Sequence, residues 1–490
     1  MIKGNHLKLT SFEDFEKIEA AEDCIWISPV YAVESSFNDL IVSWNSCTPA
    51  GSWVEIFARA YLPEYDGWTD SKGRTLSGWS DWITWGRWSP LIARNCPHQQ
   101  DSHERKDSSE TNGWVYSYSM YGAGDSSLNV RGELTASAFQ LKAVLHAEED
   151  CCSLPQIRLL AATWKNTLNP DWQKECTYPE AAVEPAESVL LDTPAISQMS
   201  RDPDYVNQIC SATCIAMQLD GRGEDVLPED VTLMNYDYGF GGNGNWSYSC
   251  AAAGDYGYES YVSYSSFEAI RQELSKGYAV ALSVKYSNKT GDTLPYLTHG
   301  PCRTPGHLIT VVGYYYSQAF GEYVYYSNDP AASCDTETAR REYRQSELDK
   351  CWYRRAAYFV HDRYTDADNM ARTNIPAKLV PAGDHPDPWV LVADGKQIRI
   401  PADFLKNRRE EFGSHGTVCW FIEDELLELP ADCRRVNANH KFRYDGFTIT
   451  PDGYLTFEKD QLTRLLQEGR RVTLYVLNNS GTMWTAECSL

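Results

Sequence analysis

A long stretch of alternating apolar and polar residues, from about residue 24 to residue 175, constrains the fold of this chain most strongly. Segments such as LIVSWNSC and WVEIFARAYL have the pattern of β-strands with one buried face. No convincing amphipathic helix lies between Trp26 and Trp164. These patterns predict an all-β N-terminal domain, a β-sandwich or jelly roll.

The same stretch is rich in tryptophan and holds eleven of the sixteen in the chain. Trp79, Trp82, Trp85 and Trp88 follow one another at intervals of three, which predicts successive rings on opposite faces of one strand. Two interpretations of these rings remain open. They pack in the core and at its rim, which we favour, or they form a flat platform for a sugar or a peptide.

The pattern changes after residues 178–195, a Pro-, Ala- and Glu-rich segment that predicts a linker leading into a short strand. In the next segment, SSFEAIRQELSKG, Ser265 and Glu268 have the spacing of a capping box. Gly277 is expected to end that helix. Two apolar strands follow, in GHLITVVGYYY and EYVYYSNDPA. Helices followed by strands predict a central α+β domain.

From about residue 373 the chain reads as short strands with glycine-containing turns, interrupted by one helix in EKDQLTRLLQEG. This segment carries no candidate chemistry. The predicted organisation is therefore a multidomain chain with three parts: an N-terminal β-sandwich with its linker over residues 1–190, an α+β domain over 191–372, and a small β-rich accessory domain of unknown role over 373–490.

Charge and composition exclude several classes of function. The net charge of −24 disfavours binding to nucleic acid and to anionic membranes, and no run of eighteen apolar residues predicts a membrane span. The N-terminus lacks the pattern of a signal peptide, which predicts a cytoplasmic protein, or a secreted one if a leader was removed. The fifteen cysteines are odd in number and contain no CxxC pair, which favours reduced thiols.

Two cysteines at the start of a predicted helix, in NQICSATCIAMQLDG, are the first candidates for chemistry. Cys210 falls in the first turn, where the helix N-terminus supplies a partial positive charge that favours a thiolate. Cys214 lies one turn further on, among apolar residues that face inward. The spacing therefore predicts Cys210 as a nucleophile and Cys214 as a core residue.

A base for this thiol is predicted on the following strands. His307 follows Gly306 and opens an apolar strand, and Asp329 ends the next strand. Each residue alone has an ordinary explanation, since histidines at strand ends and aspartates before proline are common. Adjacent strands would nevertheless bring the two side chains together at one end of a sheet. With Cys210 they predict a Cys–His–Asp arrangement.

Metal binding is the competing interpretation of the same residues. Cys210 and Cys214 form C-x3-C, while Cys302 and His307 form C-x4-H. Structural zinc sites usually draw on tighter pairs such as C-x2-C, so zinc is not favoured. For Cys334 and Cys351 the sequence leaves both packing and a disulfide open.

Five segments occur in the order found in a known family. They are ISQMSRDPDYVNQICSATCIAM, NGNWSYSCAAAGDYGYESYV, SSFEAIRQELSKGYAVALSV, TPGHLITVVGYYY and YVYYSNDPA. Over roughly residues 192–362 the chain resembles bacteriocin-processing-type, peptidase C39-like cysteine peptidases of bacteria, in their stand-alone branch. The Trp-rich segment also looks like a domain often found with this branch. The resemblance implies a papain-like fold for the central domain.

The resemblance also implies a role for each matching residue. Cys210 would attack a carbonyl, His307 would move the proton, and Asp329 would hold the imidazole in place. Gln198 matches the glutamine whose side-chain amide, with the backbone N–H of Cys210, would stabilise the oxyanion. No metal or organic cofactor is implied. The expected partner is a peptide or protein substrate, hydrolysed through an acyl-enzyme on Cys210.

The sequence departs from the family in two places. The relatives usually have Trp-Cys-Ser-Pro where this chain has Ile209-Cys210-Ser211-Ala212, and a long insertion at 285–306 precedes His307. Two alternatives to a peptidase therefore remain. One is a non-catalytic protein whose N-terminal domain binds a glycan or cell-wall ligand, and the other is a papain-like acyltransferase.

Overall fold

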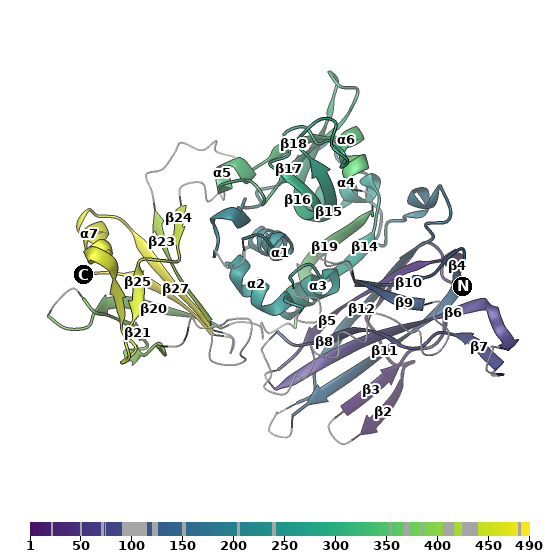
Figure 1. Cartoon of the computed structure of the whole chain (residues 1–490), viewed down its shortest axis with the longest axis horizontal. Coiled ribbons are helices and arrows are strands. Elements are labelled where there is room, and N and C mark those ends of the chain that lie inside the picture. Colours follow the sequence, from purple (N-terminus) through teal and green to yellow (C-terminus); the bar gives the residue numbers. More distant parts are fainter. Residues whose placement is uncertain are drawn as a thin grey trace.

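The structure of the chain is a computed structural model (Figure 1). It describes all residues except 21–22, 50, 70–72, 74, 91–114, 120–125, 149–152, 203–205, 238–241, 353, 367–372, 385–386, 403, 405–415, 424–439 and 479–481.

Two β-sheets pack face to face in the N-terminal part of the chain (Figure 1). The five-stranded sheet has the order β1 (His6–Leu9), β12 (Gln156–Lys165), β5 (Asp39–Cys47), β10 (Ser126–Val130) and β9 (Val115–Ser119). The seven-stranded sheet has the order β2 (Glu16–Ala20), β3 (Asp23–Ile27), β11 (Ala136–Ala147), β6 (Ser52–Thr69) and β7 (Thr75–Trp79), with β4 (Tyr31–Phe37) on β11 and β8 (Ile83–Trp88) on β6. Trp44 and Trp164 from the first sheet meet Ile56 and Phe139 from the second in one apolar cluster.

The four tryptophans spaced three apart do not share one strand. Trp79 ends β7, Trp82 lies in the connection, and Trp85 and Trp88 belong to β8. The last two are both buried in the sandwich core, so the prediction of opposite faces is wrong for them. The register of β8 against β6 shifts around Gly86, whose φ is +84°. This bulge adds one residue to β8 and returns the second ring to the same face.

The central part of the chain contains a third sheet, whose helices lie between its strands along the sequence. Its strand order is β14 (Tyr258–Tyr264), β19 (Ala356–Arg363), β15 (Val280–Ser287), β16 (Arg303–Ser317), β17 (Glu322–Asn328) and β18 (Arg341–Arg344), with β13 (Ser188–Leu190) on β16. The helices are α1 (Cys210–Asp220), α2 (Pro228–Asn235), α3 (Trp246–Asp255), α4 (Phe267–Ser275), α5 (Asp335–Thr338) and α6 (Gln345–Cys351). No helix in the described part of the chain has both the length and the apolar character needed to cross a membrane.

The five-stranded N-terminal sheet is joined to this central part through buried polar groups. Ser247 of α3 donates to the carbonyl of Val42 in β5 at 2.6 Å. Asn45 of β5 donates to the carbonyl of Ser260 in β14 at 2.8 Å. A side chain on the helix glycine Gly254 would collide with the backbone and side chain of Asn45, with a closest approach of 2.6 Å. The two parts therefore share a close-packed, hydrogen-bonded interface, which holds α3 against the N-terminal sheet.

The structure shifts one predicted helix start and anchors the predicted linker. Helix α4 begins one residue later than the sequence predicts, because Ser266, and not Ser265, accepts the N-cap hydrogen bond from Ala269. Gly277 follows the helix with a φ of +92°, as expected. The segment before β13 is bonded to α4, since the backbone N–H of Val183 donates to the side chain of Gln272 at 3.0 Å.

A fourth sheet forms the C-terminal part of the chain, at the left of Figure 1. Its order is β24 (His440–Arg443), β23 (Gly416–Glu423), β27 (Val472–Asn478), β28 (Thr482–Cys488), β20 (Thr373–Pro381), β21 (Trp389–Ala393), β26 (Leu455–Phe457) and β25 (Phe447–Ile449), with β22 (Lys396–Ile398) on β21 and α7 (Gln461–Gln467) beside it. Leu227, just before α2, packs against Cys419, Leu477 and Met483 of this sheet. The C-terminal sheet therefore contacts the helical side of the central part.

Candidate active site

Cys210 is the first residue of α1, and its side chain is half-buried. No side chain caps this helix, so the N–H groups of its first turn are not consumed by a capping residue. The thiol accepts from the backbone N–H groups of Ser211 and Leu308. One turn further on, Cys214 is fully buried among apolar residues, as its position in the sequence predicts. The two cysteines therefore occupy different environments on one helix.

The next two candidate residues, His307 and Asp329, come together from adjacent strands. Strands β16 and β17 are antiparallel, with Thr310 opposite Asn328. This register brings the Nε2 atom of His307 to 2.8 Å from the Oδ1 atom of Asp329. His307 lies inside β16, which begins four residues earlier at Arg303, and the histidine therefore does not open the strand as the sequence suggests. Both side chains are buried.

The thiol and the imidazole stabilise each other's charged forms. Burial opposes ionisation of Cys210, but the hydrogen bond from His307 and the charge of its ring outweigh it, so the pKa of the thiol is lowered. Burial also opposes protonation of His307. The charge of Asp329, its hydrogen bond and the contact with Cys210 outweigh that effect and raise the pKa of the ring well above its usual value. Each shift favours the charged form of its group, the thiolate of Cys210 and the imidazolium of His307.

Two tyrosines that the sequence did not single out hold the carboxylate of Asp329. The hydroxyl groups of Tyr286, in β15, and Tyr343, in β18, both donate to its Oδ2 atom at 2.8 Å. The backbone N–H of Ala331 donates to Oδ1 at 3.1 Å. Burial alone would raise the pKa of Asp329, but His307 and the two tyrosines lower it below its usual value. The carboxylate is therefore ionised and fixed at both oxygens.

Gln198 lies in a short 3-10 turn, η3 (Gln198–Ser200), beside the segment that follows Asp329. Its backbone N–H donates to the carbonyl of Pro330 at 2.9 Å. Its side-chain nitrogen donates to the carbonyl of Val206, four residues before Cys210, at 2.6 Å. An amide nitrogen carries two hydrogens, so one remains for a further acceptor. The Oε1 atom is buried and has no hydrogen-bond partner among the described residues.

The residues of the alternative zinc interpretation do not form a compact ligand set. Cys214 is buried inside α1, and the thiol of Cys302 lies 3.7 Å from the hydroxyl of Tyr286. Among the described residues, Cys210, Cys302 and His307 do not bring their ligand atoms within 4.8 Å of one another as a group. Cys334 is exposed and Cys351 is buried, and both are free thiols.

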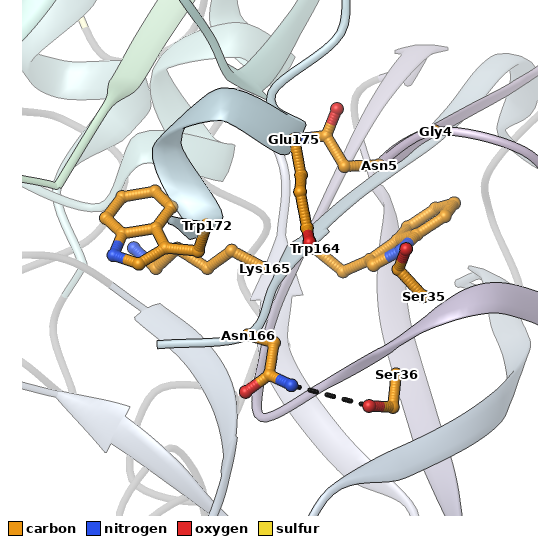
Figure 2. A pocket seen from close by; sticks show the side chains of 9 residues that line it. All are labelled: Gly4, Asn5, Ser35, Ser36, Trp164, Lys165, Asn166, Trp172 and Glu175. Carbon is orange, nitrogen blue, oxygen red and sulfur yellow. Dashed lines mark hydrogen bonds between the residues drawn. The ribbon is translucent and has the colours of Figure 1, made fainter. Parts of the chain in front are cut away.

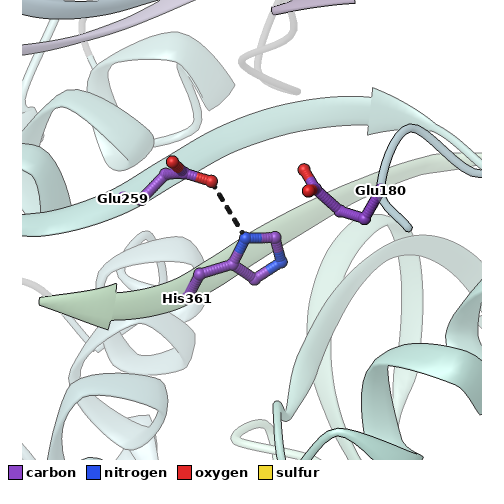
Figure 3. Close-up of side chains that lie close together, drawn as sticks. All are labelled: Glu180, Glu259 and His361. Carbon is purple, nitrogen blue, oxygen red and sulfur yellow. Dashed lines mark hydrogen bonds and ion pairs between the residues drawn. The ribbon is translucent and has the colours of Figure 1, made fainter. Parts of the chain in front are cut away.

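A second histidine cluster lies elsewhere in the central sheet (Figure 3). Glu180, Glu259 and His361 place their potential ligand atoms within 4.8 Å of one another. The ammonium group of Lys8 already bonds to Glu180 at 2.5 Å and to Glu259 at 2.8 Å. The cluster is therefore a set of ion pairs that contains its own cation, and it ties the first strand of the chain to the central sheet.

Hollows lie beside the described residues of the N-terminal sheets, and two of them are large enough to hold at least a water molecule. One is a cavity of about 30 Å³ beside Lys165 and Trp172, which has room for about one water molecule (Figure 2). The other is an open pocket of about 480 Å³ that includes Trp26 and Tyr364. Lys17 lies 4.5 Å from the centre of the Trp26 ring, and Arg158 lies 5.3 Å from that of Tyr364. Cationic side chains therefore cover one face of each ring, and a glycan ligand for this part stays a prediction.

Two protein families match this chain. Residues 190–359 match the Peptidase_C39 like family, and residues 8–164 match the Peptidase C39 N-terminal domain. The resemblance to peptidase C39-like proteins is confirmed. The peptidase C39-like segment contains Cys210, His307, Asp329 and Gln198.

Other comparisons add little. No curated protein matches the chain. A solved structure of digestive procathepsin L 3 from the larval midgut of Tenebrio molitor aligns with 38% of this chain and 73% of its own, at 15% identity and a TM-score of 0.28.

Proposed function

We propose that the peptidase C39-like segment is a papain-like cysteine peptidase that hydrolyses peptide bonds through an acyl-enzyme on Cys210. One observation carries the proposal: a thiol at a helix N-terminus has its pKa lowered by a buried histidine whose Nε2 atom is held by a buried aspartate at 2.8 Å. Nε2 of His307 is engaged by Asp329, so Nδ1 is the nitrogen that serves the thiol. Such a chain of three groups activates a nucleophile.

The proposed reaction uses only groups of this chain and water. The Cys210 thiolate attacks the carbonyl carbon, a C–S bond forms, and the carbonyl oxygen becomes an oxyanion. The backbone N–H of Cys210 and the side-chain amide of Gln198 donate to that oxyanion. The imidazolium of His307 then protonates the departing amine as the C–N bond breaks. In the second half, neutral His307 takes a proton from water, and the hydroxide oxygen displaces the thiolate from the acyl group.

Asp329 keeps the ring of His307 in the orientation that this sequence of proton transfers requires. Its ionised carboxylate stabilises the imidazolium, and the two tyrosines prevent it from turning away. The lowered pKa of the Cys210 thiol favours the thiolate, which is the nucleophilic form.

The proposed domain organisation follows the sequence prediction, with a sandwich domain and linker over 1–190, the peptidase domain over 191–372 and an accessory domain over 373–490. The bonds from Ser247 and Asn45 support a buttressing role for the sandwich. In that role the N-terminal sheets hold α3 and β14 in place behind the catalytic helix.

Digestion of a mixture of peptides, read by mass spectrometry, tests the proposed function. The wild type is expected to release fragments, and the Cys210→Ala variant is expected to release none. Cys214→Ala is the matched control, because it removes a thiol from the same helix one turn away from Cys210. Adding a primary amine separates the acyltransferase alternative, which would yield amine adducts in place of hydrolysis products. Equal cleavage by wild type and Cys210→Ala would refute the proposal.

A further inference from the structure

The C-terminal sheet reaches into the central part of the chain at a buried ion pair. Nε and Nη2 of Arg201 donate to the two carboxylate oxygens of Glu229 at 3.0 and 2.7 Å. The side chains of Arg201 and Glu229 are 3% and 0% exposed. Tyr444, just after β24, donates its hydroxyl to Oε1 of Glu229 at 2.6 Å. A residue of the C-terminal part thus completes the hydrogen bonding of a pair that belongs to the central part.

A second contact joins the same two parts one residue further along the chain. Thr417 of β23 donates its hydroxyl to the carboxylate of Asp202 at 3.0 Å. The backbone N–H of Asp202 donates to Glu229 at 3.2 Å. Thr417 and Asp202 are both buried. The C-terminal sheet therefore holds two consecutive residues, Arg201 indirectly through Glu229 and Asp202 directly through its carboxylate.

Those two residues directly follow the turn that carries Gln198. Arg201 is the C-cap of η3, and its backbone N–H donates to the carbonyl of Gln198 at 3.1 Å. On its other side the turn is held by Ser197, whose backbone N–H donates to Asp335 at 2.7 Å. The Gln198 turn is thus fixed at one end by the segment after Asp329 and at the other end by the contacts with the C-terminal sheet.

We propose that the C-terminal sheet is a positioning element of the active site, in which Tyr444 and Thr417 hold the Gln198 turn through Arg201, Asp202 and Glu229. The proposal rests on the proposed function of Cys210 and Gln198. Both C-terminal residues are positioning residues, since they act on the Gln198 turn through Arg201, Asp202 and Glu229. The arrangement gives the C-terminal part a role in catalysis that its own sequence does not reveal.

The role makes a specific chemical prediction, because the reactions of the thiol differ in their need for an oxyanion site. Alkylation by iodoacetamide is a displacement at a saturated carbon and forms no oxyanion. In acylation by p-nitrophenyl acetate the C–S bond forms first and gives a tetrahedral oxyanion, which then collapses as its C–O bond breaks and p-nitrophenolate leaves. A displaced Gln198 turn therefore slows acylation of Cys210 and leaves its alkylation unchanged.

The test measures both rates on the full chain for the wild type, Gln198→Ala and the double variant Tyr444→Phe/Thr417→Val. Removal of one oxyanion donor costs roughly 100- to 1000-fold. We expect Gln198→Ala to lose acylation on that scale and the double variant to lose about tenfold. Iodoacetamide labelling of Cys210 stays within about twofold in both variants. Tyr454→Phe, which removes a hydroxyl from another site in the C-terminal part, is the matched control, and Cys210→Ala gives the background.

The outcomes separate this inference from the proposed function. An unreactive wild-type thiol, no faster than background in either reaction, would remove the proposed function and this inference with it. Wild-type acylation that the double variant retains in full would overturn the positioning role alone. An acylation rate unaffected by Gln198→Ala would do the same. Equal losses of acylation and alkylation in the double variant would indicate general destabilisation and would likewise overturn it.

Discussion

The central sheet contains two buried histidines bonded to carboxylates, and only one of them adjoins a reactive group. His307, on β16, uses Nε2 for Asp329 and leaves its other nitrogen for Cys210. His361, on β19, uses Nδ1 for Glu259 at 3.1 Å and Nε2 for Glu273 at 2.8 Å. Both rings have a raised pKa. The difference is that His361 has no ring nitrogen left for any other partner.

This difference shows that a histidine–carboxylate contact is not by itself a catalytic feature. A proton can be passed on only where one ring nitrogen is held and the other faces the group that reacts. At His361 two carboxylates hold the ring from both sides, and Lys8 bonds to one of them, Glu259. The first site is arranged for proton transfer and the second for holding the first strand of the chain against the central sheet.

Replacing each histidine in turn gives the largest expected contrast. His307→Ala removes the base and the partner of the thiolate, and we expect peptide hydrolysis to fall by roughly 10⁴-fold. His361→Gln should leave the rate per folded molecule within about twofold. Both ring nitrogens of His361 already bond to carboxylates, so this ring has no part in the proposed proton transfer. Steady-state rates, corrected for the folded fraction by circular dichroism, check both values. Comparable losses in the two variants would erase the distinction between the sites.

The stability of the His361 cluster should depend on pH with a defined sign. Burial opposes protonation of this ring, but the bonds to Glu259 and Glu273 raise its pKa to about 9 from 6.5 in the unfolded chain. The folded state is therefore stabilised fully below about pH 6.5, and the stabilisation is lost as the pH rises through 9. We expect the stability difference between wild type and His361→Gln to be about 3 kcal/mol larger at pH 6 than at pH 10.

Urea denaturation of the two proteins at both pH values measures this difference. Subtraction of the variant cancels the contribution of His307, which both proteins share. Lys8→Met is a useful companion variant, because it removes a cation from the same cluster that stays charged over this range. A stability difference that does not change with pH would mean that His361 is not protonated in the folded state.

Removal of a tyrosine hydroxyl from Asp329 should have the smallest effect. Tyr286→Phe or Tyr343→Phe removes one hydrogen bond from the buried carboxylate of Asp329. A hydrogen bond to a charged group contributes about 1.5 kcal/mol, and we expect that much less stabilisation of the carboxylate that orients His307. We expect peptide hydrolysis to fall about tenfold in each variant, with little change in KM. Tyr325→Phe, on the neighbouring strand β17, is the control. Unchanged hydrolysis in both site variants would show that Asp329 needs no support.

Part of the candidate active site is predictable because it depends on local rules. A helix start fixes the environment of Cys210, and two strands in sequence fix the pairing that brings His307 to Asp329. The resemblance to the family, not a physical rule, identified Gln198. Tyr286 and Tyr343 were not predicted as site residues, because they come from the strands β15 and β18, which flank β16 and β17. Nothing in the sequence around either tyrosine distinguishes it from the many others in this chain.

The fold shows the same limit between local and long-range information. Alternation predicts the strands of the sandwich, but it does not reveal the bulge at Gly86 that turns Trp85 and Trp88 to one face. The contact of Tyr444 with Glu229 joins residues 215 positions apart, and no local pattern reports it. This is why the C-terminal part carries no visible chemistry in its sequence.

The central claim is that Cys210 and His307 form a thiolate–imidazolium pair, and the pH dependence of alkylation tests it most directly. Iodoacetamide labelling of each cysteine, read by mass spectrometry from pH 4 to 10, gives the pKa of each thiol. We expect Cys210 in the wild type to label with a midpoint well below the ordinary thiol pKa of about 8.5. His307→Ala should move that midpoint to or above 8.5. A wild-type midpoint at 8.5 or higher, or one that His307→Ala leaves unchanged, would contradict the claim.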